Sequence, residues 1–226
     1  MSSILDYLKN KRLVWQANGQ AEAPSLSSTG FTELDNALEG GFPTQGMIDI
    51  HSPVGIGEIR LLLPNLITRQ QQERLLVFIA PPLQINAELL AECGFRLDQV
   101  LIIEPESKQH ALWSAEQCLK SGCCHSVLIW QHNLQVHQVK RLLLAAEQGQ
   151  ALNIVFHHQK SSGVSLPVSL AMRLNASPQG LNIEVTKRKG GWRSEAFHLD
   201  MRSHWPELAI EPRPDNILTF PDSKVS

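Results

Sequence analysis

A loop at residues 52–59 carries the residue types and spacing closest to a known chemistry, the binding of nucleotide phosphates. It follows an apolar segment at 47–51 and reads Ser52-Pro53-Val54-Gly55-Ile56-Gly57-Glu58-Ile59. Phosphate-binding loops between a strand and a helix have the pattern G-x-x-x-x-G-K-[S/T], in which backbone N–H groups, the lysine and the hydroxyl hold the phosphates and Mg²⁺. Ser52, Gly55 and Gly57 keep part of this outline, but Glu58 stands at the lysine position and Ile59 at the hydroxyl position.

The exchange of lysine for Glu58 reverses the charge that would face a polyphosphate. At a separation of a few ångströms, repulsion in place of attraction costs on the order of several kcal/mol. The loss of the hydroxyl at Ile59 also removes a ligand for Mg²⁺. We therefore interpret residues 52–59 as a degenerate phosphate-binding loop that does not bind ATP, and we expect the chain to use no cofactor.

The best candidate for contact with nucleic acid is a basic stretch at residues 186–193. Its cations and its aromatic side chain have the chemistry to bind backbone phosphates and to stack on a base; they are Lys187, Arg188, Lys189, Trp192 and Arg193. The same stretch fits a hairpin tip whose lysines keep a sheet edge soluble. The chain has 20 Lys and Arg against 22 Asp and Glu, a net charge of −2, which excludes a surface that binds nucleic acid everywhere.

Histidine, cysteine and serine residues show no spacing typical of a metal site or a nucleophilic enzyme. His132 and His137 are five residues apart, and none of the four cysteines forms a C-x-x-C pair. The sequence contains no G-x-S-x-G elbow. We expect no metal ion and no membrane contact. We expect a cytoplasmic protein with reduced thiols, because no signal peptide or membrane-length apolar segment is visible.

The loop belongs to a regular alternation of strand and helix patterns. Strands are predicted at 47–51, 75–80, 99–103, 126–130 and 152–156, and helices at 28–41, 58–72 with an interruption at Pro64, 86–93, 109–121 and 134–148. Because the strands are almost wholly apolar, this order predicts an α/β fold with a mainly parallel, helix-covered sheet. Segments at 169–175, 181–187 and 194–199 predict a C-terminal antiparallel β-meander that extends the sheet.

These patterns divide the chain into three parts. We predict an N-terminal helix and linker at 1–27, a core domain at 28–201 and an extended or flexible tail at 202–226. Both ends carry apolar residues that are candidates for binding a partner: Ile4, Leu5, Leu8, Trp15, Trp205, Leu218 and Phe220. An N-terminal helix that folds back on its own core, and a tail with no partner, are the alternatives.

The residues before the loop resemble the opening of the RecA ATPase core. The resemblance lies in the order Ser28-Thr29-Gly30, Leu34-Asp35, Gly40-Gly41 and Pro43-x-x-Gly46. It implies a RecA-like core and places Pro82 at the water-activating glutamate and Gln131 at the metal-shell aspartate. Glu58 and Ile59 likewise stand where the lysine and the hydroxyl residue would be. The resemblance therefore implies a chain that is not an enzyme. It also places the short segment 157–163 at a mobile DNA-binding loop, as a weaker contact candidate.

Residues 53–64 and 111–117 resemble more closely the ImuA family, the RecA-like accessory proteins of bacterial mutagenic translesion synthesis, which are related to the cell-division inhibitor SulA. This resemblance covers about residues 12 to 201. It implies a scaffold of the DNA-damage (SOS) response whose partners are ImuB, an inactive polymerase homologue, and an error-prone replicative-type polymerase. RecA or DNA would be further contacts, with DNA bound weakly or indirectly and the complex associated with the nucleoid. The alternative is a SulA-like inhibitor of division that binds FtsZ.

Overall fold

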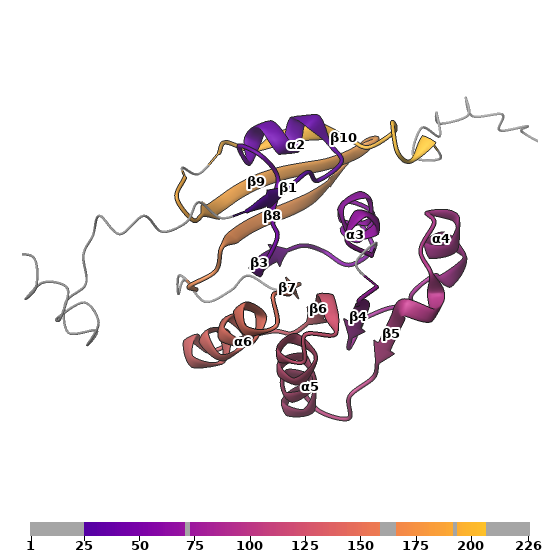
Figure 1. The fold of residues 1–226 in the computed structure, drawn as a ribbon. Coiled ribbons are helices and arrows are strands. Elements are labelled where there is room, and N and C mark those ends of the chain that lie inside the picture. The colour runs from indigo at the N-terminus through magenta and orange to yellow at the C-terminus, as the bar shows by residue number, and fades with distance from the viewer. Residues whose placement is uncertain (1–24, 71–72, 159–165, 192–193, 207–226) are drawn as a thin grey trace, which may run out of the picture.

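The computed structural model describes residues 25–70, 73–158, 166–191 and 194–206 (Figure 1). The strands are β1 (Leu26–Ser27), β2 (Phe42–Pro43), β3 (Gly46–His51), β4 (Leu75–Ile79), β5 (Val100–Ile103), β6 (Cys124–Trp130), β7 (Leu152–His157), β8 (Leu170–Ser177), β9 (Gly180–Arg188) and β10 (Phe197–Asp200). The helices are α2 (Thr32–Ala37), α3 (Leu63–Gln70), α4 (Ala87–Glu92), α5 (Lys108–Lys120) and α6 (Val136–Gln148), with a 3-10 turn η1 (Leu97–Gln99) before β5.

Eight of these strands form one sheet in the order β10-β9-β8-β3-β7-β6-β4-β5. The pairs from β8 through β5 are all parallel, whereas β9 pairs antiparallel with β8 and with β10. The expected mixed α/β fold with a mainly parallel sheet and a C-terminal antiparallel extension is therefore confirmed. The outer strand β5 differs from the apolar, doubly buried pattern, because Leu101 and Ile102 lie 40% and 45% exposed at the sheet edge.

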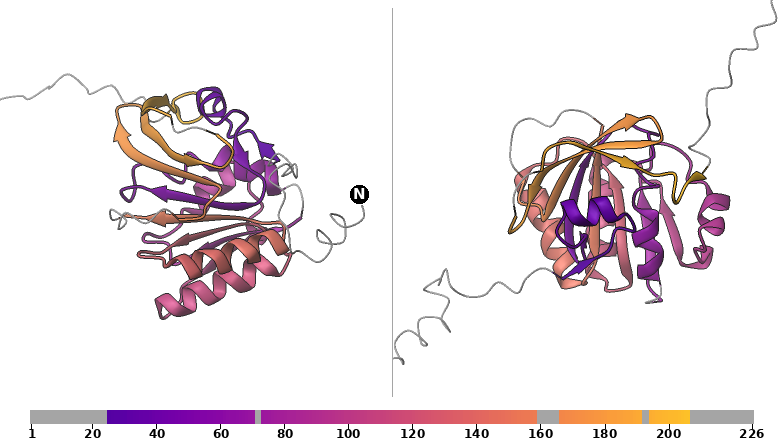
Figure 2. Two further views of the ribbon diagram at one scale, coloured as in Figure 1. Left: turned by 90° about the vertical axis from the view of Figure 1, so that its left-hand side faces the viewer. Right: turned by 90° about the horizontal axis from the view of Figure 1, so that it is seen from above.

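The sheet has an apolar core on each face. Helices α5 and α6 lie side by side on one face and contribute Ala111, Ala115, Leu119, Val139 and Leu142 (Figure 2). The other core lies against α2, α3 and α4 and contains the stacked rings of Trp130 and Phe156, whose centroids are 4.7 Å apart. Burial of apolar surface on both faces supplies most of the driving force for this fold.

The serine-threonine-glycine motif has a structural explanation in this fold. The Asp35 carboxylate, at the centre of α2, accepts hydrogen bonds from the Ser28 hydroxyl at 2.5 Å and from the Thr29 N–H at 2.7 Å. Gly41 has a φ of 111°, and a Cβ there would lie 2.2 Å from the Ser27 carbonyl oxygen. The motif therefore fixes the turn before α2 and allows β1 to approach β2.

Several boundaries differ from the sequence prediction, two of them at the start of an element. The helix expected from residue 58 begins at Leu63, after turns at 58–62. Pro64 has no N–H to donate and would clash with the preceding turn in a longer helix, so it occupies the first turn instead. Leu26 and Ser27, which the sequence pattern places in the linker, form strand β1 and pair with Pro43 and Phe42.

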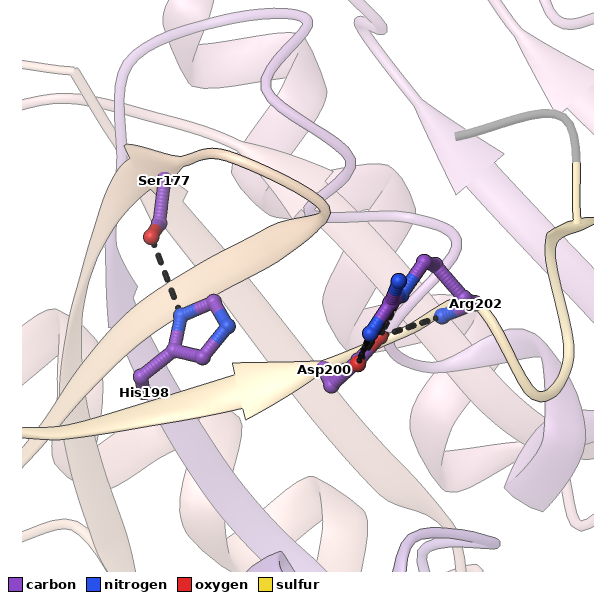
Figure 3. Close-up of polar contacts among 4 residues, drawn as sticks. All are labelled: Ser177, His198, Asp200 and Arg202. Carbon is purple, nitrogen blue, oxygen red and sulfur yellow. Dashed lines mark hydrogen bonds and ion pairs between the residues drawn. The ribbon is translucent and has the colours of Figure 1, made fainter. Parts of the chain in front are cut away.

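The end of β10 is fixed by short polar contacts (Figure 3). The Arg202 Nε donates to both Asp200 carboxylate oxygens at 3.0 and 2.9 Å, and the Ser177 hydroxyl lies 3.0 Å from His198 Nδ1. The chain then turns so that the Trp205 N–H bonds to the Met201 carbonyl at 2.9 Å. Trp205 is 7% exposed and belongs to the core, not to an extended tail as we expected for a partner-binding residue.

Candidate functional site

The loop at residues 52–59, here called the glycine loop, leaves the carboxyl end of β3. The Ser52 N–H donates to the His157 carbonyl at 3.0 Å, which continues the β3–β7 ladder by one residue and holds the loop's start. Gly55 and Gly57 follow with φ values of 77° and 103°. These left-handed conformations favour glycine, because a Cβ would be strained there. The two glycines therefore form the tight turn predicted from the sequence, although turns at 58–62 separate it from the helix that was expected to follow directly.

Glu58 closes the loop on itself. Its side chain is buried, with 4% of the residue exposed, and its Oε1 accepts a hydrogen bond from the Gly55 N–H at 3.0 Å. In a phosphate-binding loop the backbone N–H groups point at the phosphate oxygens. Here a carboxylate of the same chain takes one of them. The sequence predicted only a repulsive charge at this position, whereas the structure gives Glu58 a second role as the internal acceptor.

The glycine loop borders a pocket of ≈490 Å³ whose other wall is the segment 81–90. Its apolar lining includes Val54, Ile56, Ile59, Pro81, Pro82, Leu83, Ile85, Leu89 and Trp130. The charged residues of the lining are Glu58 and Arg60. The Arg60 Cζ lies 5.5 Å from the centroid of the Trp205 ring. The surface is suited to apolar groups and carries no lysine for a polyphosphate.

The four predicted replacement positions do not all meet at this pocket. Glu58, Ile59 and Pro82 line it. Gln131 lies outside the lining and is buried, with its N–H donating to the Phe156 carbonyl at 3.2 Å. The structure thus joins three of the positions in one pocket and places the fourth in the neighbouring ladder between β6 and β7.

A polar cluster on the other face of the sheet was missed in the sequence. Asp49 lies in the middle of β3, 5% exposed, with its carboxylate 2.7 Å from His157 Nε2 and 3.3 Å from His51 Nε2. The two imidazole rings stack with centroids 5.0 Å apart. His51 pairs with His157 in the β3–β7 register, which explains why both rings reach the same carboxylate.

The Asp49 carboxylate is held in its charged form. Burial raises its pKa, but hydrogen bonds and charge interactions with His157 and His51 outweigh burial and lower the pKa to about 2. The signal in the sequence was an aspartate inside an apolar strand with a histidine two residues later, since i and i+2 share a face. The buried carboxylate between the two imidazoles therefore links the carboxyl ends of β3 and β7.

The basic stretch at 186–193 is partly engaged in internal contacts. The Lys187 ammonium donates to the Leu166 carbonyl. The Arg188 guanidinium donates to the Leu38 carbonyl at 2.7 Å and pairs with Glu39 at 2.5 Å. Lys189 is exposed, while Trp192 and Arg193 lie outside the described residues. Contact with DNA stays a prediction, and among the described residues Lys189 is the cation best placed for it.

The remaining candidates for partner binding lie outside the described residues: Ile4, Leu5, Leu8, Trp15, Leu218 and Phe220. None of the helices in the described part of the chain is long and apolar enough to cross a membrane. Over the same residues, no three His, Cys, Asp or Glu side chains are grouped to hold a metal ion.

The segment from the end of β3 to the start of β7 matches a known family. The family model described as cell division inhibitor SulA matches residues 51–153. The cell division inhibitor SulA of Pseudomonas aeruginosa is 31% identical over 140 residues, which cover 57% of this chain and 84% of that protein. The chain belongs to the SulA family. The matched residues include the glycine loop and its pocket.

Similarity also extends to RecA proteins. RecA of Desulforapulum autotrophicum is 27% identical over 111 residues, or 49% of this chain and 32% of that RecA. RecA of Brevibacillus brevis is 28% identical over 106 residues, or 46% of this chain and 30% of that RecA. This SulA-family chain therefore spans about a third of the length of these RecA relatives. The crystal structure of SulA from Pseudomonas aeruginosa is 29% identical, covers 50% of this chain and 98% of that chain, and superposes with a TM-score of 0.40.

Proposed function

We propose that this SulA-family chain is a non-catalytic accessory protein of SOS mutagenic translesion synthesis. In this role it is a scaffold for ImuB and an error-prone replicative-type polymerase, as in the ImuA family. The observation that carries the proposal is Glu58, whose buried carboxylate accepts the Gly55 N–H beside an apolar pocket. On this reading the glycine loop is a degenerate P-loop, and the protein acts by binding other proteins.

The similarity to SulA and to RecA supports a place in the response to DNA damage. The elements outside the SulA match support more than a minimal SulA protein. The turn and helix α2 precede residue 51, and strands β8, β9 and β10 follow residue 153. These elements extend the sheet and the core beyond the segment that the family model matches, which suits a scaffold with several partners. RecA and DNA remain further candidates for contact.

A second candidate function is inhibition of cell division through FtsZ. The SulA match over residues 51–153 and the 31% identity to the Pseudomonas aeruginosa inhibitor favour it. In this case the chain would slow FtsZ polymerisation and show no stable association with ImuB. The two functions therefore differ in partner, and one experiment separates them.

Affinity capture of ImuB by the purified protein, with an FtsZ polymerisation assay run in parallel, tests both functions. We expect folded ImuB to be retained and FtsZ polymerisation to keep its normal rate. Two variants refine the result, one with Ile4, Leu5 and Leu8 changed to Ser and one with Leu218 and Phe220 changed to Ser. Each variant is the control for the other. The variant that removes the apolar residues in contact with ImuB should weaken the capture of ImuB about tenfold or more. Absence of ImuB from the captured material would reject the scaffold, and slowed FtsZ polymerisation would support the second function.

A further inference from the structure

A polar pocket lies at the amino ends of the parallel strands, whereas the glycine loop lies at their carboxyl ends. It has a volume of ≈420 Å³ and is formed where β3, β4, β6 and β7 begin. Its lining is Ser25, Ser27, Thr44, Gln45, Thr68, Arg69, Arg74, His125 and Gln150. The lining contains two arginines, a histidine and four hydroxyl groups, and it includes no aspartate or glutamate. This composition is typical of a site for an anion.

Arg69 is buried with uncharged partners. Its Nε donates to the Asn65 side-chain oxygen at 2.9 Å, and its terminal nitrogens donate to the Pro43 and Thr44 carbonyls at 2.8 Å each. These bonds satisfy donors but do not neutralise the charge. Burial and, to a smaller extent, the positive charge of Arg74 lower the pKa of Arg69 to about 10. A negative group in the pocket would relieve both effects.

The guanidinium of Arg74, like that of Arg69, donates to uncharged carbonyl groups. Its terminal nitrogens donate to the Gln150 carbonyl at 3.0 Å and to the Gly149 carbonyl at 2.5 Å, after the end of α6. Its Nε is buried and makes no hydrogen bond with the described residues. A guanidinium has five N–H donors, so donor capacity remains for a ligand. The two arginines thus place positive charge and unused donors around one cavity.

His125 adds a buried ring nitrogen that has no hydrogen-bond partner among the described residues. The residue is 1% exposed, and its Nδ1 lies 3.0 Å from the Ser126 hydroxyl oxygen, while its Nε2 has no partner among the described residues. When the Ser126 hydroxyl donates to Nδ1, the ring proton lies on Nε2. Burial, with the charges of Arg69 and Arg74, lowers the pKa of His125 to about 3, so the ring is neutral at pH 7. Unpaired buried polar groups are costly and are rare without a ligand or water.

We propose that this pocket binds the phosphate group of a small phosphate ester. Arg69, Arg74, His125 and the four hydroxyl residues line the pocket from different elements, which suits an anion with several acceptor oxygens. Thr44 supplies one of these hydroxyls, beside that of Ser25. The volume lies in the range of small-molecule sites and exceeds the needs of a bare phosphate. This site is independent of the proposed scaffold function and would give the chain a small-molecule regulator.

Calorimetric titration of the full-length protein tests the site, with inorganic phosphate, ribose 5-phosphate and acetate as probes. Chloride keeps the ionic strength constant. We expect saturable binding of both phosphates and none of acetate. Tighter binding of ribose 5-phosphate would identify an ester as the ligand, and binding of inorganic phosphate alone would identify the free ion. Acetate that binds as well as phosphate, or absence of phosphate binding, would overturn the proposal.

Three variants assign the binding to this pocket. Arg74→Gln should weaken phosphate affinity about tenfold or more, because a charge-assisted contact is lost. Thr44→Val keeps the shape and both guanidinium groups and should weaken it about fivefold. Arg96→Gln is the matched control, since Arg96 is exposed and pairs with Asp98. The nitrogen resonance of His125 Nε2 should shift on phosphate addition even if Arg74→Gln does not fold. Unchanged affinity in the folded Arg74→Gln and Thr44→Val variants, with an unchanged His125 resonance, would refute the assignment.

Discussion

Replacement of Glu58 by lysine, the residue of phosphate-binding loops, is expected to destabilise the protein by about 4 kcal/mol without creating a nucleotide site. The variant removes the acceptor of the Gly55 N–H and puts an unpaired ammonium into a position that is 4% exposed. Loss of one partner of a buried charged contact costs about 3–5 kcal/mol. The free energy of unfolding from urea denaturation, measured with and without Mg²⁺ and ATP, checks both parts of the prediction.

Glu58→Gln is the matched control for this experiment. Its amide oxygen can still accept from Gly55, and no charge is buried, so we expect a loss of about 1 kcal/mol. If the lysine variant were as stable as the parent and bound ATP, the glycine loop would be an intact phosphate site that lacks only its lysine. That result would contradict the role given to Glu58.

Replacement of Asp49 by alanine has the second largest expected effect, a loss of about 3 kcal/mol at pH 7. In the parent protein the buried His157 Nε2 lies 2.7 Å from the Asp49 carboxylate. The change removes this partner and also the contact with His51. Asp98→Ala is the control, because Asp98 is exposed and its pair with Arg96 lies in solvent. A loss for Asp49→Ala no larger than for Asp98→Ala would show that the cluster contributes nothing to stability.

The same variant should alter the acid dependence of stability. The folded-state pKa of Asp49 is about 2, below its ordinary value of 3.8, so the unfolded state binds the proton more readily. The stabilisation by Asp49 is therefore fully present above pH 3.8 and is lost as pH falls toward 2. Between pH 5 and pH 3 this loss amounts to about 1 kcal/mol. Urea denaturation at the two pH values should show this component in the parent and not in Asp49→Ala.

The order of elements in the parallel part of the sheet was predictable because each strand is a short apolar run between turn residues. Strands β4, β6 and β7 show this pattern clearly. The start of α3 was not predicted, since the effect of Pro64 depends on whether the helix extends before it or begins at it. Strand β1 has only two residues, and its partner β2 comes after α2 in the sequence. No local sequence pattern therefore predicts this pairing.

The functional residues were predictable only where they are neighbours in sequence. The loss of lysine at Glu58 is visible in the motif, but its hydrogen bond to Gly55 depends on the loop's backbone. Asp49 and His157 meet because β3 and β7 are adjacent, although the two residues are 108 positions apart in the chain. Such contacts require the strand order, which an alternation of apolar segments does not specify.

The melting temperature of the purified protein in the presence and absence of Mg²⁺ and ATP tests the central claim most directly. Any ligand that binds the native state tightly must raise the melting temperature. With the Glu58 carboxylate at the Gly55 N–H and an apolar pocket beside it, we predict no change at millimolar ATP and no hydrolysis above background. A saturable rise of several degrees, with release of phosphate from ATP, would contradict the non-catalytic role of the glycine loop.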